Sequence, residues 1–149
     1  MNRKLKDLFD MRKNVIHSVS SDTTIKDAVD LMNKNHIGAL MIIDSGEIKG
    51  ICSERDVMIK LASTDDLVGH LPVKEIMTPK EKLIFSDGEQ TLEEIMRMMT
   101  DKHIRHLPIM ENDRLAGVIS IRDIIRMLLR DARTKSEQLT NYIEGKYPR

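Results

Sequence analysis

An internal repeat constrains this chain more than any other feature of its sequence. Sliding the 149 residues by 67 positions aligns residues 35–61 with residues 102–128, and this alignment matches Gly50 with Gly117. Self-similarity at one fixed spacing indicates two copies of the same supersecondary unit. Each copy has about 67 residues, too few to bury a good core alone, so we expect the two copies to pack together.

Hydrophobic periodicity predicts the same order of elements in both repeats, namely strand, helix, strand, strand and helix, which is an α/β architecture. Residues 15–19 are expected to form a short apolar strand, and a continuous apolar run over 39–44 indicates a buried strand. Ser45-Gly46 and Asn112-Asp113 are typical of hairpin turns, and Ser53 is placed to cap the next helix. The last helix runs unusually far, over about 122–144. The chain is divided accordingly into repeat 1 (1–67), repeat 2 (68–130) and a C-terminal helix extension (131–149).

Charge and composition argue against several classes of protein. The chain carries 24 basic and 24 acidic residues, whereas nucleic-acid coats and basic membrane-surface proteins depend on net positive charge. Aromatic residues make up 3%, which leaves few platforms for base stacking. The longest apolar runs are about six residues, too short for a membrane helix. One cysteine and a charged N-terminal sequence without an apolar signal region predict a cytoplasmic protein.

The most distinctive motif is the junction between the last strand and the last helix of each repeat. It reads Gly-Ile-Cys-Ser-Glu-Arg-Asp from Gly50 and Gly-Val-Ile-Ser-Ile-Arg-Asp from Gly117. Ser-x-x-Asp is itself a helix capping box, so a purely structural role is the simplest interpretation. The same geometry suits a nucleotide: a helix N-terminus binds phosphate, a first-turn Asp can hold ribose hydroxyls, and Arg can reach phosphate. The two roles are compatible.

The repeated Gly-x-x-Ser-x-x-Asp pattern resembles the cystathionine-β-synthase (CBS) domain. Two further segments strengthen this resemblance: Ile-Arg-His-Leu-Pro-Ile-Met from Ile104 and the lead-in segment Val-Lys-Glu-Ile-Met-Thr-Pro from Val73. Two copies over about residues 5–130 are similar to a CBS pair, or Bateman module, of the stand-alone prokaryotic type. The resemblance implies two small sheets with flanking helices, packed with pseudo-two-fold symmetry around two ligand clefts.

The resemblance also implies which residues line the two clefts. In each cleft the Ser and Asp of one repeat would face the lead-in segment and the loop of the other, with apolar members around an adenine and the Asp on the ribose. Cleft A would contain Ser53, Arg55, Asp56, Thr78, Leu83, Ile84, Ile104, Arg105 and His106. Cleft B would contain Ser120, Arg122, Asp123, Val15, Ile16, Ile37, Gly38 and Ala39.

The two clefts are expected to differ in charge. Arg105-His106 in repeat 2 corresponds to Gly38-Ala39 in repeat 1, and Thr78 corresponds to Asp10. Cleft B therefore lacks the loop cations, keeps only Arg122, and has an Asp that repels phosphate. We expect cleft A to bind the phosphate of a nucleotide. Cleft B could be empty, hold a nucleoside or serve structurally.

Other candidate sites are weaker. Cys52 aligns with Ile119 on a predicted strand, so we expect a small buried hydrophobe rather than a nucleophile. His103-x-x-His106 would supply half of a metal site, but no Cys or carboxylate pair completes it nearby, and no metal is predicted. The sequence contains no G-x-S-x-G motif, P-loop or dinucleotide glycine fingerprint. We therefore do not predict an enzyme.

The predicted function is regulatory ligand binding. The ligand is expected to be an adenine nucleotide, AMP above all, with ADP, ATP, NAD(H) and S-adenosylmethionine as alternatives that share the adenosine group. Because few residues remain for an effector domain, the signal is expected to pass to a partner protein in trans or to a changed dimer. The apolar end of the last helix, with Leu139, Tyr142 and Ile143, favours a homodimer, and a loosely docked tail is the alternative. A structural dimer with degenerate clefts and a nucleic-acid-binding protein stay open as other functions.

Overall fold

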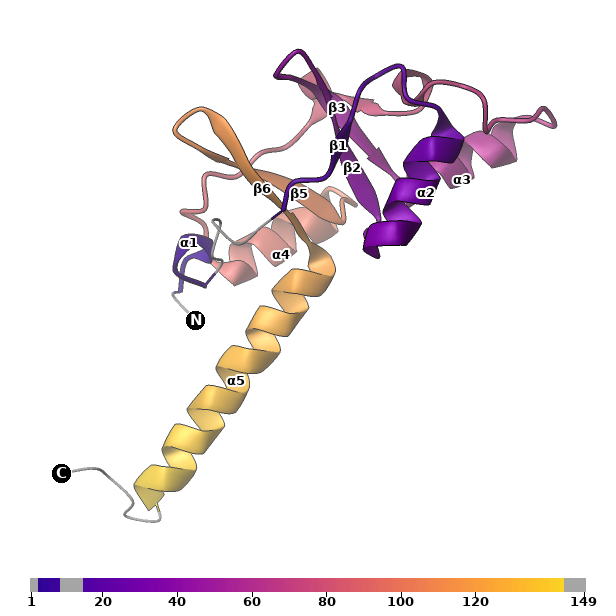
Figure 1. Ribbon diagram of the computed structural model, residues 1–149. Helices are drawn as coiled ribbons and strands as arrows, with labels where there is room; N and C mark the ends of the chain where they lie inside the picture. Colours follow the sequence, from indigo (N-terminus) through magenta and orange to yellow (C-terminus); the bar gives the residue numbers. More distant parts are fainter. Residues whose placement is uncertain (1–2, 9–14, 144–149) are drawn as a thin grey trace. The chain divides into compact units, whose positions relative to one another are not determined.

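The computed structural model describes residues 3–8 and 15–143 of the chain. These residues form two compact units: the central unit, residues 15–84, and the terminal unit, residues 3–8 together with 85–143. Both units combine strands with helices (Figure 1), so the α/β class predicted from the repeat is confirmed. The two units are described one at a time.

The central unit is a four-stranded sheet with two α-helices. Its strands follow the order β1-β2-β3-β4, with β1 parallel to β2 and the other pairs antiparallel. The predicted strand over 39–44 has the observed bounds of β2, whereas the first strand is shorter than the predicted 15–19. The elements are β1 (Ser18–Val19), α2 (Ile25–Asn35), β2 (Ala39–Asp44), β3 (Glu47–Ser53), α3 (Glu54–Ser63), η2 (Val73–Glu75), β4 (Thr78–Pro79) and η3 (Lys80–Lys82).

The terminal unit repeats the hairpin and adds a long helix. Strands β5 and β6 pair in antiparallel fashion, and Ser86 forms a parallel bridge to Ile109 where the central unit has β1. Figure 1 shows α5 continuing directly from β6, and every residue of its second half, 132–143, is exposed. The predicted helix end at Glu144 lies outside the described residues. The elements are α1 (Leu5–Leu8), α4 (Leu92–Asp101), β5 (His106–Glu111), β6 (Arg114–Ser120) and α5 (Ile121–Ile143).

The two hairpins turn through left-handed backbone. Ser45 and Gly46 have φ angles of 50° and 81°, and Asn112 and Asp113 have 50° and 60°. Two consecutive residues with positive φ form the tight hairpin turn that matches the natural twist of the strands. Only Gly, Asn and Asp adopt this backbone readily, so both predicted turns are confirmed, and Ser45 is the position with the least favourable residue type.

The core is duplicated together with the repeat. Buried positions follow the shift of 67 residues, and residue size varies between matched positions, as with Ala28 and Ile95 or Cys52 and Ile119. Because the matched positions stay apolar while their volumes differ, each unit packs its own core. The central core contains Ile25, Ala28, Met32, Leu40, Ile42, Cys52, Val68 and Val73. Buried apolar residues of the terminal unit are Leu5, Leu92, Ile95, Met99, Leu107, Ile109, Ile119 and Ile124.

Each unit is completed by the lead-in segment of the other repeat. In the central unit Val73 is fully buried, and its N–H donates to the Thr23 carbonyl oxygen at 2.8 Å. The Lys74 N–H donates to the Ser21 carbonyl at 3.1 Å, and its ammonium lies 2.6 Å from Asp22. The start of repeat 2 is therefore part of the structure built by repeat 1.

The terminal unit shows the same arrangement with the start of repeat 1. Leu5 is fully buried, and its N–H donates to the Gln90 carbonyl oxygen at 2.9 Å. The Lys6 N–H donates to the Gly88 carbonyl at 3.0 Å, and its ammonium lies 2.6 Å from Glu89. These contacts correspond one by one to those of the central unit. The start of repeat 1 therefore belongs to the terminal unit, and the start of repeat 2 belongs to the central unit.

Candidate functional site

The terminal junction, where β6 passes into α5, is held by reciprocal hydrogen bonds. The main-chain N–H and the hydroxyl of Ser120 reach Asp123 Oδ2 at 2.9 Å and 2.6 Å, and the Asp123 N–H donates back to Ser120 Oγ at 3.2 Å. The Ile121 N–H donates to the Arg105 carbonyl oxygen at 2.9 Å. Two of the N–H groups that a helix leaves unpaired at its start are thus satisfied within the protein.

The central junction, where β3 passes into α3, has the same construction. Ser53 N–H and Oγ reach Asp56 Oδ2 at 2.8 Å and 3.0 Å, and the Asp56 N–H lies 3.4 Å from Ser53 Oγ. The Glu54 N–H donates to the Gly38 carbonyl at 3.0 Å. The capping interpretation of Ser-x-x-Asp is therefore confirmed at both junctions. Since caps occupy these amides, side chains rather than free amides must supply most of any phosphate binding.

The loops before β2 and β5 contact the junction of their own repeat. Ala39 lies opposite Ser53 in the β2–β3 register, and His106 lies opposite Ser120 in the β5–β6 register. The prediction placed Arg105 and His106 with Ser53 in cleft A, and Gly38 and Ala39 with Ser120 in cleft B, and this grouping stays a prediction. Within each unit the loop opens the strand whose hairpin partner ends at the Ser, so main-chain pairing fixes loop and Ser side by side.

In the central unit the lead-in segment of repeat 2 pairs with the strand that leads to the junction of repeat 1. In the antiparallel pair of β3 and β4, Thr78 lies opposite Ile51 and Pro79 lies opposite Gly50. A Cβ atom on Gly50 would stand 2.3 Å from the Thr78 carbonyl oxygen, a distance that real contacts do not allow. The close approach of β4 therefore requires glycine at position 50, and the fold alone explains this residue.

The other predicted site residues divide between the same two units. In the central unit, Leu83 and Ile84 follow η3, and Ile37 follows α2; all three are half-buried, as is Ile16 just before β1. Val15 is 70% exposed. The terminal unit holds Ile104, Arg105, His106, Ser120, Arg122 and Asp123. The residue Asp10, expected to repel phosphate, lies outside the described residues.

The side chains beside the two junctions differ in charge. Around the terminal junction the side chains Arg105, His106 and Arg122 belong to the same unit as Asp123. Around the central junction the equivalent loop positions are Gly38 and Ala39, so Arg55 is the cation that the motif provides there. The difference in charge between the loops was expected from the sequence, and the assignment of each loop to a cleft stays a prediction.

Cys52 is a core residue on β3. It is fully buried, and this burial raises the pKa of its thiol to about 12, so the reactive thiolate is not formed near neutral pH. Among the described residues no group of three or more His, Cys, Asp and Glu side chains could hold a metal ion. Within the same residues no helix has the length and hydrophobicity needed to cross a bilayer.

Comparison with known proteins follows this geometry. The family model described as CBS domain matches residues 5–63 and 73–130. The mitochondrial CBS domain-containing protein CBSX3 of Arabidopsis thaliana is 34% identical over 131 residues, which are 86% of this chain and 64% of CBSX3, slightly under two thirds of its length. The CBS domain-containing protein YhcV of Bacillus subtilis is 28% identical over 109 residues, 73% of this chain and 76% of YhcV. The crystal structure of the CBS-domain containing protein ATU1752 from Agrobacterium tumefaciens aligns with a TM-score of 0.77 and 31% identity, covering 83% of this chain and 98% of that one.

Proposed function

Because the chain belongs to the CBS domain family and contains two such domains in tandem, we propose that it binds adenosine-containing ligands at its two junctions and reports their presence to a partner protein. A CBS pair is a regulatory, ligand-binding module. What remains to be assigned is the ligand of each junction and the route by which the signal leaves.

The observation that carries this proposal is the carboxylate held at the start of α3 and of α5. In both junctions one oxygen of the Asp side chain accepts from the capping Ser, at 2.8 Å for Asp56 and 2.9 Å for Asp123. The carboxylate is thereby oriented at a half-buried position, where its other oxygen is suited to accept ribose hydroxyls. A base and a sugar common to many nucleotides would be recognised in this way.

The charge of the loops favours different ligands at the two junctions. Arg105 and Arg122 suit a phosphorylated ligand at the terminal junction, with AMP as the smallest adenine nucleotide. Gly38 and Ala39 offer no charge at the central junction, which suits an adenosine compound without phosphate. The CBS pair of protein MJ0100, which shares the fold with a TM-score of 0.73 at 22% identity, was crystallised with 5-methylthioadenosine and S-adenosyl-L-methionine. Neither compound carries a phosphate.

The signal is proposed to leave through the helices that start at the junctions. Exposed large apolar side chains gather on these two helices: Met58, Ile59 and Leu61 on α3, and Ile125, Leu129, Leu139, Tyr142 and Ile143 on α5. A ligand on the first turn of a helix can change the equilibrium of that helix between two positions only if it binds them with different affinity. We propose that a second copy of this chain covers α5, giving a cytoplasmic homodimer whose effector protein binds in trans.

A thermal-shift panel tests the proposal. Protein freed of bound ligand by unfolding and refolding is heated with AMP, ADP, ATP, NAD, S-adenosylmethionine, 5-methylthioadenosine and adenosine, with GMP and ribose 5-phosphate as controls. A ligand at 100 times its dissociation constant stabilises the fold by about 2.7 kcal/mol. The proposal requires that at least one adenosine compound raises the melting temperature while the controls do not.

A structural dimer without ligand is the second candidate, and the capping boxes favour it. Ser53, Asp56, Ser120 and Asp123 already have partners within the protein, so they are explained without a nucleotide. This candidate predicts that no compound of the panel shifts the melting temperature, and that dimerisation is nevertheless retained.

A further inference from the structure

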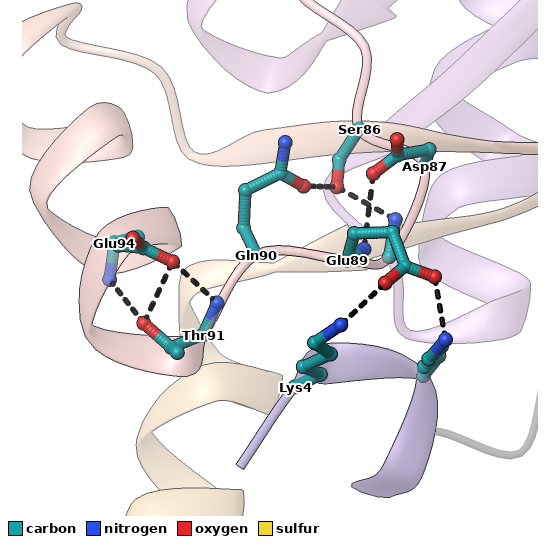
Figure 2. A network of polar contacts seen from close by, with 9 residues as sticks. Lys4, Ser86, Asp87, Glu89, Gln90, Thr91 and Glu94 are labelled. Carbon is teal, nitrogen blue, oxygen red and sulfur yellow. Dashed lines mark hydrogen bonds and ion pairs between the residues drawn. The ribbon is translucent and has the colours of Figure 1, made fainter. Parts of the chain in front are cut away.

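The N-terminal segment Arg3–Lys6, here called the strap, is bound to the terminal unit in the manner of a peptide ligand. Its main chain is held by bonds from Leu5 N–H to the Gln90 carbonyl and from Lys6 N–H to the Gly88 carbonyl. Lys4 forms an antiparallel bridge with Thr91. Residues 86–91 that receive the strap (Figure 2), together with Asp131 on α5, are called the seat.

The charged side chains of the strap have partners of opposite charge on the seat. The ammonium groups of Lys4 and Lys6 lie 2.7 Å and 2.6 Å from the two oxygens of Glu89, one on each. Between them, Leu5 is fully buried, and the Arg3 guanidinium donates to Asp131 Oδ1 at 3.1 Å. The seat therefore recognises a defined pattern in a segment whose last two residues begin α1: arginine, lysine, apolar residue, lysine.

The seat holds its own shape. Ser86 Oγ bonds to the Gln90 side chain and accepts from the Gly88 N–H at 3.0 Å, and Asp87 Oδ1 accepts from the Glu89 N–H at 3.0 Å. Figure 2 shows these bonds on one side of the Glu89 carboxylate, with Lys4 of the strap on the other side. None of these bonds involves a strap residue, so the strap is not needed to form them.

The strap is held to the seat partly by ion pairs that are open to solvent. The side chains of Lys4, Lys6 and Glu89 are about half exposed, and exposed ion pairs contribute little to stability. The strap's polar contacts with the seat can therefore be broken at modest cost. In the central unit, the segment that begins at Val73 continues into β4, which pairs with β3.

Asp131 connects the strap to the helix of the terminal junction. Its side chain is only 5% exposed, and among the described residues its Oδ2 atom has no hydrogen-bond partner, with Lys135 Nζ at 3.6 Å. Detachment of Arg3 would leave this buried carboxylate with Lys135 alone, which is unfavourable. Asp131 and Ser120 lie at the middle and the start of one continuous helix segment, so loss of the strap weakens α5 near the junction.

We propose that the seat is a peptide-binding site selective for an arginine–lysine–apolar–lysine segment, that the strap is its reversibly bound resident ligand, and that strap binding stabilises α5. The part concerning the terminal junction rests on the function proposed above, whereas the peptide site does not. Detachment of the strap would then act as an on–off element for the ligand at that junction.

Amide hydrogen exchange of the full chain gives the first test, with the central unit as an internal control. The Leu5 and Lys6 amides bond to Gln90 and Gly88 just as the Val73 and Lys74 amides bond to Thr23 and Ser21. Reversible binding predicts exchange at least tenfold faster at Leu5 and Lys6 than at Val73 and Lys74. Equal protection of the two pairs would overturn the proposal.

A labelled peptide with the sequence of residues 3–8 gives the second test. The full-length double variant Lys4→Glu, Lys6→Glu places its strap charges against Glu89, so its seat should be vacated and should bind the peptide at least tenfold more tightly than the wild type does. Adding Glu89→Lys should abolish this binding and permit binding of a peptide with glutamates at both lysine positions.

The central-unit variant Lys74→Glu is the matched control and should bind the peptide no better than wild type does. Absence of peptide binding by a folded double variant contradicts the proposal, and if that variant does not fold, exchange in the wild type decides.

Exchange along α5 tests the coupling. In the double variant, amides of residues 128–135 should exchange at least threefold faster than in wild type, while amides of α3 should not change. No nucleotide is present in any of these measurements. A negative thermal-shift panel would therefore contradict the proposed ligand and leave the proposed peptide site unaffected. Absence of peptide binding to the seat would contradict the peptide site and leave the proposed ligand unaffected.

Discussion

His106 lies directly opposite Ser120 in the antiparallel pair of β5 and β6. This register brings the Arg105-His106 loop to the Ser-x-x-Asp motif of its own repeat, and the equivalent register brings Ala39 to Ser53. The two copies of one motif thus lie beside loops of different charge. If both bind ligands, they are expected to prefer different ones.

Arg105→Ala is predicted to weaken AMP binding at the terminal junction about 10–100-fold, because a hydrogen bond to a charged group contributes roughly 1.5–3 kcal/mol. Adenosine has no phosphate, so its affinity should change less than about twofold. Titration calorimetry with AMP and adenosine measures both effects. An unchanged AMP affinity would remove the phosphate role of Arg105.

Asp123→Ala is predicted to weaken the same AMP site, while Asp56→Ala leaves that site intact and weakens a phosphate-free ligand at the central junction. Each substitution also removes part of a capping box and should cost about 1 kcal/mol of stability. Calorimetry combined with urea unfolding separates these effects. If Asp56→Ala rather than Asp123→Ala removes the AMP site sensitive to Arg105, the original grouping of cleft A is correct.

Gly50→Val is predicted to destabilise the central unit by about 3 kcal/mol, at the upper end of what overpacking usually costs. The cause is the Thr78 carbonyl oxygen, which a Cβ atom would approach to 2.3 Å. Gly69→Ala is the control, since its Cβ would meet Lys26 at an ordinary 3.6 Å and should cost less than about 0.5 kcal/mol. Urea denaturation measures both. A stable Gly50→Val protein that fails to bind ligand would instead show that the glycine is needed for ligand binding.

Acidification is predicted to release the strap at low pH only. Hydrogen bonds from Lys4 and Lys6 lower the pKa of Glu89 to about 2. A carboxylate whose pKa is lowered in the folded state stabilises it above the ordinary pKa of about 4.5, and this contribution is lost as the pH falls through about 2. The NMR signals of the Leu5 and Lys6 amides should therefore stay unchanged near neutral pH and shift in that acidic range, before those of Val73. Glu89→Gln should remove this step, and a persistent step would assign it to another group.

Leu139→Asp is predicted to shift the proposed homodimer to monomer. Leu139, Tyr142 and Ile143 are 64%, 68% and 82% exposed on one side of α5, and burying a leucine contributes roughly 1.5–3 kcal/mol, so the dimer should weaken about 10–100-fold. Light scattering at micromolar concentration should give about twice the 17.1 kDa chain mass for wild type. Asn141→Asp, on another side of the same helix, should leave the mass unchanged. A wild-type monomer at all concentrations contradicts the prediction.

Local structure was predictable because its causes are local. The apolar run over 39–44, the Ser45-Gly46 turn and the cap at Ser53 each depend on residues that are close in sequence, and all three occur where expected. The first strand was predicted too long, since Val15 is 70% exposed and pairing begins only at Ser18. Hydrophobicity alone did not show at which residue pairing with β2 begins.

The partners of distant segments were not predictable from periodicity. Leu5 packs against a segment more than 80 residues away, and the apolar pattern of residues 5–9 does not say which repeat receives it. A signal was nevertheless present in the repeat alignment, where Glu89 matches Asp22 at a shift of 67 residues and Lys6 matches Lys74 at a shift of 68. Lys6 with Glu89 and Lys74 with Asp22 are two pairs of opposite charge at corresponding positions. They would have indicated that each lead-in segment packs with the other repeat.

The exchange of segments also sets the order in which the two units can form during synthesis. The central unit is one continuous stretch of chain, and it can fold as soon as residue 84 has left the ribosome. The terminal unit cannot, because Leu5 must wait for Gln90 and Arg3 for Asp131. Residues 3–6 are made before the central unit but are among the last to reach their native place, and until then an apolar leucine between two lysines is exposed on the nascent chain.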